Sequence, residues 1–275
     1  MEHITNWTAL WRELVETRYR SRHSESKADQ DSWRERARHF DAAVKRRWAE
    51  PDSSRRFILS QIDENCTFLD IGAGTGAWAV ALAPKTRRIT AVEPSPAMIE
   101  VMRENLAAEG IENVDIVQDA WPDAEVGVHD LSLCSHAMYA DFPRFIQRMI
   151  ESTARTCFLL MRAPVANGVM ALASRRVWGH PHDSPNFIIA YNILLEMDIF
   201  ANVLMENTGT WGAWTNETME SAFDEIKTKL GLEGPSEHDD YLKGLLCERL
   251  TYQDGQYVWP PSMRSALVYW DVTAQ

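Results

Sequence analysis

The sequence has few features typical of a secreted, membrane or metal-binding protein. Its 275 residues include only four cysteines, Cys66, Cys134, Cys157 and Cys247, and none has the CxxC spacing of a zinc or redox site. No signal peptide opens the chain, and no apolar run approaches the roughly 20 residues of a membrane span. There is no internal repeat and no low-complexity tract. These absences predict a reduced, cytoplasmic protein with no membrane association.

A basic excess is also lacking. The chain has 40 Asp and Glu against 28 Lys and Arg, a formal net charge of −12. Residues 1–60 hold 13 basic and 10 acidic residues, net +3, so the remainder holds 15 basic and 30 acidic residues, net −15. An acidic body repels phosphate backbones, which predicts a substrate other than nucleic acid. Docking of RNA or protein through the basic segment stays open, although its charges are interleaved in sign.

Short apolar segments alternate with helical ones from Cys66 onward, and this order predicts an α/β fold with a doubly wound, mostly parallel, seven-stranded sheet. The predicted strands are 66–71, 88–93, 113–118, 130–134, 156–162, 200–206 and 265–272. The predicted helices between them are 75–84, 96–109, 141–154, 186–196 and 216–230. The clearest of these is 96–109, which Ser95 can cap at its start and Gly110 can end.

We divide the chain into an N-terminal helical cap, 1–60, and a main domain, 61–275. The cap has predicted helices at 5–24 and 31–49 and a third that begins at Asp52-Ser53-Ser54. The same segment could instead form an arm for a homodimer. Residues 163–198 interrupt the alternation and predict a lid over the ligand-binding edge, and 231–262 precede the last strand.

The segment Phe68-Leu69-Asp70-Ile71-Gly72-Ala73-Gly74-Thr75-Gly76 is the most specific motif of the sequence. A buried strand ends there, and alternating glycines lead into a helix with backbone bare enough for close contact with a ligand. The motif resembles the first motif of the class I S-adenosylmethionine-dependent methyltransferases. The resemblance extends over residues 66–162 and implies S-adenosylmethionine as the cofactor.

Each part of that cofactor requires a different partner. Gly72 and Gly74 would let the backbone approach the methionine moiety, and Gly76 would allow close packing of strand and helix. Asp70 would meet the ammonium group, directly or through water. Glu93, which ends the next strand, would accept hydrogen bonds from the ribose hydroxyls.

The resemblance implies further cofactor contacts after the second, third and fourth strands. Asp119 would accept a hydrogen bond from the adenine amino group, and Trp121 would stack on the ring or shield it. The other cofactor-binding residues are expected to be Ala73, Pro94, Met98, Ala120 and Ser135. No metal ligand is expected.

Two other interpretations remain open. Gly72-x-Gly74-x-x-Ala77 also satisfies the dinucleotide fingerprint, which would indicate an NAD-type oxidoreductase. Asp70 argues against it, because its charge would lie near a pyrophosphate, and Asp119 has no required role there. A non-catalytic S-adenosylmethionine-binding partner subunit would also keep the glycine motif.

Methyl transfer from a sulfonium is an in-line displacement that requires alignment, with a base only where the accepting atom must lose a proton. In the resembling family, the end of the fourth strand lines the transfer site. This implies that His136 is a base or orients the substrate, with Tyr139 behind it. His136 could equally hydrogen-bond only the backbone or the cofactor. The expected acceptor is an O, N or S atom of a small molecule.

Several other residues are candidates for a role in the site. His180-Pro181-His182-Asp183 could hold a metal ion, but we interpret it as a surface turn of the lid because the residues are too close in sequence. His39 and Phe40 could close over the cofactor, yet an ordinary helix face is slightly favoured. Some pocket aromatics are expected among Trp178, Phe187, Tyr191, Trp211, Trp214 and Trp259.

Overall fold

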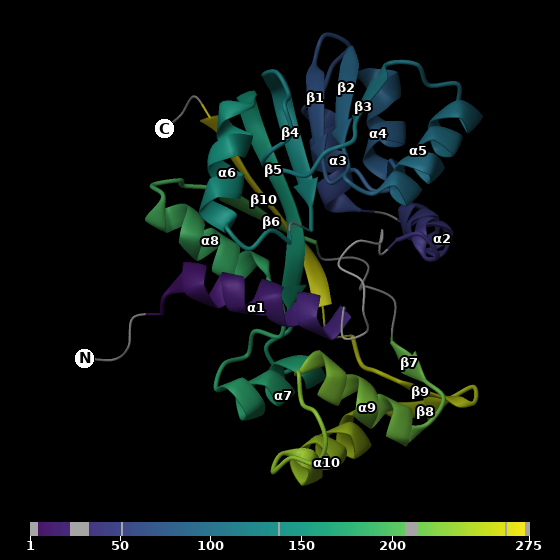
Figure 1. Ribbon diagram of the computed structural model, residues 1–275, viewed down its shortest axis with the longest axis vertical. Helices are drawn as coiled ribbons and strands as arrows, with labels where there is room; N and C mark the ends of the chain where they lie inside the picture. The colour runs from purple at the N-terminus through teal and green to yellow at the C-terminus, as the bar shows by residue number, and fades with distance from the viewer. Residues whose placement is uncertain are drawn as a thin grey trace.

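A seven-stranded sheet forms the centre of the computed structural model, which describes residues 5–22, 33–50, 52–136, 138–206, 214–261 and 263–272 (Figure 1). The strand order is β3-β2-β1-β4-β5-β10-β6. The strands are β1 (Thr67–Ile71), β2 (Arg88–Val92), β3 (Val114–Val117), β4 (His129–Ser135), β5 (Thr153–Pro164), β6 (Asn202–Met205) and β10 (Met263–Asp271). All seven predicted strands are present, and the predicted fold class is confirmed.

The order of the strands reverses between β1 and β4, and this reversal locates the ligand-binding edge. Strands β1 to β5 pair in parallel, and only β10 runs antiparallel to its neighbours β5 and β6. Ile71 pairs with Val92 on one side and Cys134 on the other, so three strands end together. In open α/β sheets, ligands bind outside the carboxyl ends of the strands at such a reversal.

Helices cover both faces of the sheet. The first face carries α3 (Ser53–Ser60), α4 (Ala77–Leu82), which continues into the short η1 (Ala83–Lys85), and α5 (Pro96–Ala108). The second face carries α1 (Trp7–Arg22), α6 (Phe142–Glu151) and α8 (Phe187–Glu196). The predicted caps are confirmed, because Asp52 accepts the Arg55 N–H at 2.8 Å and Ser95 accepts the Met98 N–H at 3.2 Å.

The first helix is part of the main core. Trp11 is fully buried, and its ring lies 4.2 Å from that of Phe142 between centroids. Its indole N–H donates to the Tyr139 carbonyl at 2.8 Å. Helix α2 (Ala37–Trp48) begins later than the predicted residue 31 and packs against α5. Among the described residues, no helix has the length and apolarity that crossing a membrane requires.

A second, smaller lobe lies below the sheet in Figure 1, and α1 lies between the two. It contains α7 (Val169–Trp178), α9 (Met219–Lys229), α10 (Asp239–Arg249) and a sheet of β7 (Thr215–Asn216), β9 (Gln256–Val258) and β8 (Thr251–Gln253). These elements share a core of their own. The insertion 163–198 is therefore divided, because α7 packs in the lobe while α8 packs on the main sheet.

Helices α7 and α10 were not predicted from the sequence. Helix α10 contains Gly244, a poor helix former, and it buries only Leu242, Leu245 and Leu246. Its stability comes from packing against α9 and α7, which the sequence pattern does not show.

Replacement of Gly76 by alanine should destabilise the protein more than the same change at Gly110. Both residues have positive φ, +81° and +63°, which costs an alanine about 1 kcal/mol. A Cβ at Gly76 would lie 2.5 Å from Cγ of the buried Met102, whereas Gly110 has open space. We expect Gly76→Ala to cost about 1–3 kcal/mol more in urea unfolding. Equal losses for the two variants would contradict this packing role.

Candidate active site at the carboxyl edge of the sheet

The turn after β1 exposes its backbone toward open space. Gly72, Gly74 and Gly76 all have positive φ, 71°, 58° and 81°. The N–H groups of Gly72 and Ala73 donate to the Val92 carbonyl at 2.8 and 3.0 Å, which ties the turn to the end of β2. A Cβ placed on Gly72 would meet no atom within 4 Å. The turn thus has a side against which a ligand can lie.

Glu93 connects this turn to the start of α5. Its carboxylate accepts the Gly74 N–H at 2.8 Å and the Ser95 N–H at 2.9 Å, and the residue is 7% exposed. Pro94 lies between these contacts and is exposed, whereas Met98 is buried. A carboxylate has about four acceptor sites, so the two backbone contacts are compatible with a further donor. The predicted contact of Glu93 with ribose stays a prediction.

Asp70 is a buried carboxyl group at the end of β1. The side chain is almost fully buried, and its Oδ2 atom has no hydrogen-bond partner among the described residues. Burial, with a smaller contribution from the charge of Glu93, raises the pKa of Asp70 to about 7. Such a carboxyl group would be stabilised in its charged form by a cation placed beside it.

The two residues after β3 that are expected to contact adenine, Asp119 and Trp121, differ in their exposure. Asp119 is exposed, and its Oδ1 atom accepts the N–H of Ala120 at 2.7 Å. Trp121 is 7% exposed, and its indole N–H donates to the Phe145 carbonyl at 3.3 Å. Asp119 is therefore at the open edge, whereas Trp121 packs against α6. Their contacts with adenine stay predictions.

The end of β4 is held in an unusual conformation. Ser135 pairs with Leu160 of β5, and the N–H of His136 donates to the Leu160 carbonyl at 2.8 Å. His136 has a φ of +63°, which is uncommon for any residue other than glycine and is enriched at functional sites. Tyr139 follows, with its hydroxyl accepting from Arg144 at 3.2 Å. The structure thus holds both predicted catalytic residues at the carboxyl edge.

Helix α2 contacts the glycine turn at Gly74 and leaves Gly72 open, so Phe40 is not an ordinary residue of an exposed helix face. The Phe40 ring lies 3.8 Å from the position of a Cβ on Gly74. Asn105 of α5 donates to the Asp41 carboxylate and to the Thr75 carbonyl, both at 2.9 Å. Sequence reasoning missed Asp41 and Asn105 because their partners are distant in the chain. The helical spacing of α2 alone does not indicate which residue faces the turn.

The interpretation of residues 180–183 as a surface turn was wrong for His182. Its side chain is 9% exposed, and its Nδ1 atom lies 3.3 Å from Nδ2 of the buried Asn186. The ring of Trp7 packs against it at 6.4 Å. In the described part of the chain, no group of three or more His, Cys, Asp or Glu is arranged to hold a metal ion.

Most of the expected pocket aromatics pack in the two cores. Trp178, Phe187 and Tyr191 contact the main core, and Trp178, Trp214 and Trp259 contact that of the lobe. Trp211 lies outside the described residues. The Tyr191 hydroxyl donates to the Ala201 carbonyl at 3.1 Å, so this hydroxyl is hydrogen-bonded within the protein and does not require a ligand.

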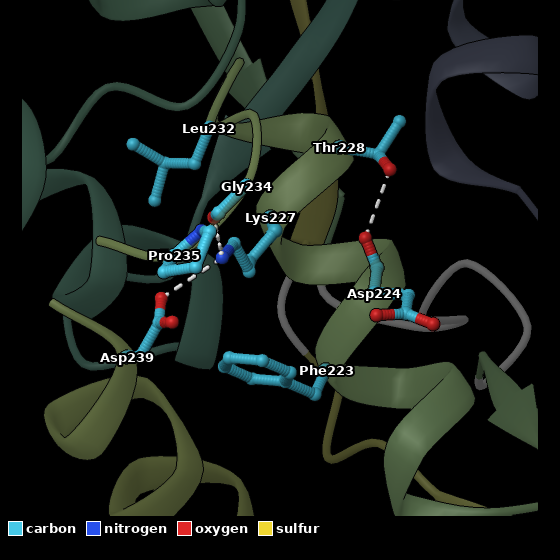
Figure 2. Close-up of a pocket in the computed structure, with 8 residues that line it drawn as sticks. All are labelled: Phe223, Asp224, Lys227, Thr228, Leu232, Gly234, Pro235 and Asp239. Atoms are coloured by element: carbon cyan, nitrogen blue, oxygen red, sulfur yellow. Dashed lines mark hydrogen bonds and ion pairs between the residues drawn. The ribbon is translucent and has the colours of Figure 1, made fainter.

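A pocket of about 450 Å³ lies in the small lobe (Figure 2). Lys227 of α9 lies inside it, bonded to the Gly234 carbonyl and ion-paired with Asp239 at 3.0 Å. These contacts join α9 to the loop before α10 and satisfy the lysine. The pocket contains none of the residues at the carboxyl edge of the main sheet. We assign the candidate site to that edge because the open glycine turn and the buried carboxyl group of Asp70 meet there, at the reversal of the strand order.

Comparison with known proteins agrees with this geometry. Residues 68–157 match the family described as "Methyltransferase domain". A "Probable ribosomal RNA small subunit methyltransferase A" of Methanosphaera stadtmanae is 27% identical over 96 residues, 34% of this chain and 30% of that protein. The match thus spans less than a third of that relative.

Two longer similarities cover most of the chain. An "Uncharacterized protein" of Haemophilus influenzae is 25% identical over 222 residues, 77% of this chain and 78% of its own. The structure of the YcgJ protein from Bacillus subtilis has a similar fold, with a TM-score of 0.51 and 18% identity over 78% of this chain and 96% of that one.

The candidate site at the reversal of the β3-β2-β1-β4-β5-β10-β6 sheet lies within the part of the chain that matches the methyltransferase family. Residues 68–157 are thus similar to methyltransferase domains, and this part of the chain includes the glycine turn after β1, Glu93 and His136.

The raised pKa of Asp70 predicts how stability depends on pH. Because the folded state holds this proton up to about pH 7, while an unfolded aspartate loses it near its ordinary value of 3.8, the group should reduce stability as pH rises between these values. The free energy of unfolding of Asp70→Asn, relative to that of the wild type, should therefore increase by up to about 4 kcal/mol from pH 4 to pH 8. Urea unfolding at both pH values measures this. The exposed Glu109→Gln serves as the control, and a pH-independent difference for Asp70→Asn would contradict the assignment.

Proposed function

We propose that the protein transfers a methyl group from S-adenosylmethionine to an O, N or S atom of a small molecule bound at the carboxyl edge of β4 and β5. The observation that carries this proposal is the buried Oδ2 atom of Asp70, which lacks a hydrogen-bond partner among the described residues, beside a glycine turn that faces open space. The chemistry that the cofactor supplies is a methyl group on a sulfonium, transferred without a protein nucleophile.

The residues of the edge fit the parts of this cofactor. Asp70 is suited to an ammonium group, because a cation would stabilise its ionised form in a buried site. The backbone at Gly72 admits close approach by the methionine moiety. Glu93 and Asp119 follow β2 and β3, in the order that ribose and adenine require.

The acceptor side of the proposed site consists of His136 and Tyr139. Where the accepting atom carries a proton, His136 would remove it, because an imidazole is the usual base near neutral pH. The hydrogen bond from His136 N–H to β5 keeps its backbone at the end of β4. Tyr139 would help to orient the acceptor from the following loop.

Two features favour a small acceptor: the acidic charge of the main domain, and the elements that lie over the proposed site. The main domain and the lobe are strongly acidic, which disfavours a nucleic-acid backbone. The chain passes from the main sheet to the lobe after β5 and after β6, and it returns from the lobe at the start of β10. Because β10 is antiparallel to β5 and β6, all three connections lie at the carboxyl edge of β5. The lobe is therefore attached beside the proposed transfer site, and Phe40 of α2 lies against the glycine turn at Gly74.

Binding of S-adenosylhomocysteine tests the cofactor site. We expect association by isothermal titration calorimetry, with affinity that increases as pH rises from 6 to 8 because Asp70 must lose its proton to pair with the ammonium group. Asp70→Asn should bind about tenfold more weakly at pH 8 and lose most of this pH dependence. Binding of NAD in place of S-adenosylhomocysteine would overturn the proposal in favour of an oxidoreductase.

The role of His136 is tested by His136→Asn, since asparagine tolerates positive φ but cannot act as a base at neutral pH. A hydroxyl acceptor would first be found by screening compounds for release of S-adenosylhomocysteine. We expect the variant to bind S-adenosylhomocysteine with unchanged affinity and to transfer methyl to this acceptor 10²- to 10⁴-fold more slowly. His136→Ala should behave alike. Unchanged turnover in both variants would show that His136 is structural.

A further inference from the structure

We infer that the ring of Phe40 recognises the positive charge of S-adenosylmethionine, so that the site distinguishes the methyl donor from its neutral product, S-adenosylhomocysteine. The inference rests on the proposed function. It adds a residue from the N-terminal cap to a site that is otherwise built from the ends of the sheet strands.

Phe40 borders the part of the glycine turn that is open to a ligand. Its Cε1 atom lies 3.8 Å from the position of a Cβ on Gly74, whereas a Cβ on Gly72 would meet no atom within 4 Å. The residue is 37% exposed, although it lies against the turn and carries a large apolar side chain. The ring therefore has accessible surface directly beside the backbone that the cofactor is proposed to contact.

The covalent structure of the cofactor determines which of its atoms lies near this ring. The sulfur of S-adenosylmethionine is bonded to both the methionine chain and the ribose methylene group. The proposed site holds the methionine part at Asp70 and Gly72 and the ribose at Glu93. Because the Glu93 carboxylate accepts the N–H of Gly74 at 2.8 Å, the path from methionine to ribose passes Gly74. The sulfur would therefore lie on the side of the turn where Phe40 is.

A sulfonium and a thioether interact differently with an aromatic ring. The face of a phenylalanine ring carries negative charge density and attracts a cation placed over it within roughly 6 Å. S-adenosylhomocysteine has a neutral sulfur at this position, which gains only dispersion contacts from the ring. Phe40 should therefore stabilise the bound donor more than the bound product.

The side chain of Phe40 is held in place by contacts on both sides of the residue in the sequence. The neighbouring Asp41 accepts from Asn105 at 2.9 Å, and Asn105 also donates to the Thr75 carbonyl at 2.9 Å. The ring of Trp33 packs against that of Phe40, with centroids 5.2 Å apart. Helix α2 also packs against α5 (Figure 1). A ring that is already positioned loses little conformational entropy when a ligand binds.

The carboxylates near the turn also attract a cation, so the experiment has to isolate the contribution of the ring. Asp70 and Glu93 would favour the sulfonium whether or not Phe40 contacts it. A preference of the wild type for either ligand is therefore not diagnostic. The diagnostic quantity is the change in the ratio of the two dissociation constants when the ring alone is altered.

The test measures binding of S-adenosylmethionine and S-adenosylhomocysteine to the wild type and to Phe40→Leu by calorimetry at pH 8. Leucine keeps an apolar side chain and a good helix former but has no aromatic ring. We expect the dissociation constant of S-adenosylmethionine to increase roughly 3- to 30-fold. That of S-adenosylhomocysteine should change by about twofold or less, because dispersion contacts are largely retained.

Two further proteins separate the charge effect from effects of shape and folding. A ring-fluorinated phenylalanine at position 40 keeps the shape of the side chain but reduces the negative charge on the ring face. It should weaken binding of S-adenosylmethionine and leave that of S-adenosylhomocysteine unchanged. Phe200→Leu is the matched control, since Phe200 is 77% exposed and precedes β6 at the far edge of the sheet. It should bind both ligands as the wild type does.

The outcomes distinguish this inference from the proposed function. Failure of the wild type to bind either ligand would overturn the proposed function and the role of Phe40 with it. Normal binding by the wild type, with an unchanged ratio of dissociation constants in Phe40→Leu, would overturn only the role of Phe40. If Phe40→Leu fails to fold, the fluorinated protein decides, and an unchanged ratio there overturns the inference.

Discussion

The carboxylate of Glu93 accepts hydrogen bonds from Gly74 and Ser95, and the candidate site depends on this one interaction. It joins the turn after β1 to the N-terminus of α5, so that the ends of two neighbouring strands are held in a fixed relation. The positive φ values of the glycines make the turn possible. Without the carboxylate, two backbone N–H groups would lose their acceptor near a buried edge.

The side chain of Asp70, close to Glu93, is buried at a cost in stability. A carboxyl group that is almost fully buried destabilises the protein once it ionises, and the charge of Glu93 adds to this effect. Fold stability alone gives no reason for this arrangement. A cationic ligand beside the carboxylate would remove this cost, as the ammonium group of the proposed cofactor would.

The covering elements come from distant parts of the chain. Helix α1 contributes Trp11 to the main core and bonds to the Tyr139 carbonyl, so it holds the segment after β4. Helix α2 extends from Gly74 to Ser265. The lobe collects α7, α9 and α10 around one core. A site framed in this way is made by segments that lie far apart in the sequence and meet only in the folded protein.

The sequence by itself determined the sheet and the position of the glycine turn at the candidate site. Strand periodicity, the caps at Asp52 and Ser95 and the spacing of the glycines are patterns of neighbouring residues, and the sequence shows them directly. The lobe, the burial of His182, the place of Phe40 beside Gly74 and the hydrogen bond from Arg47 to Ser265 were decided by the tertiary structure. Those arrangements depend on contacts between residues far apart in the chain, and local propensity carries no information about such partners.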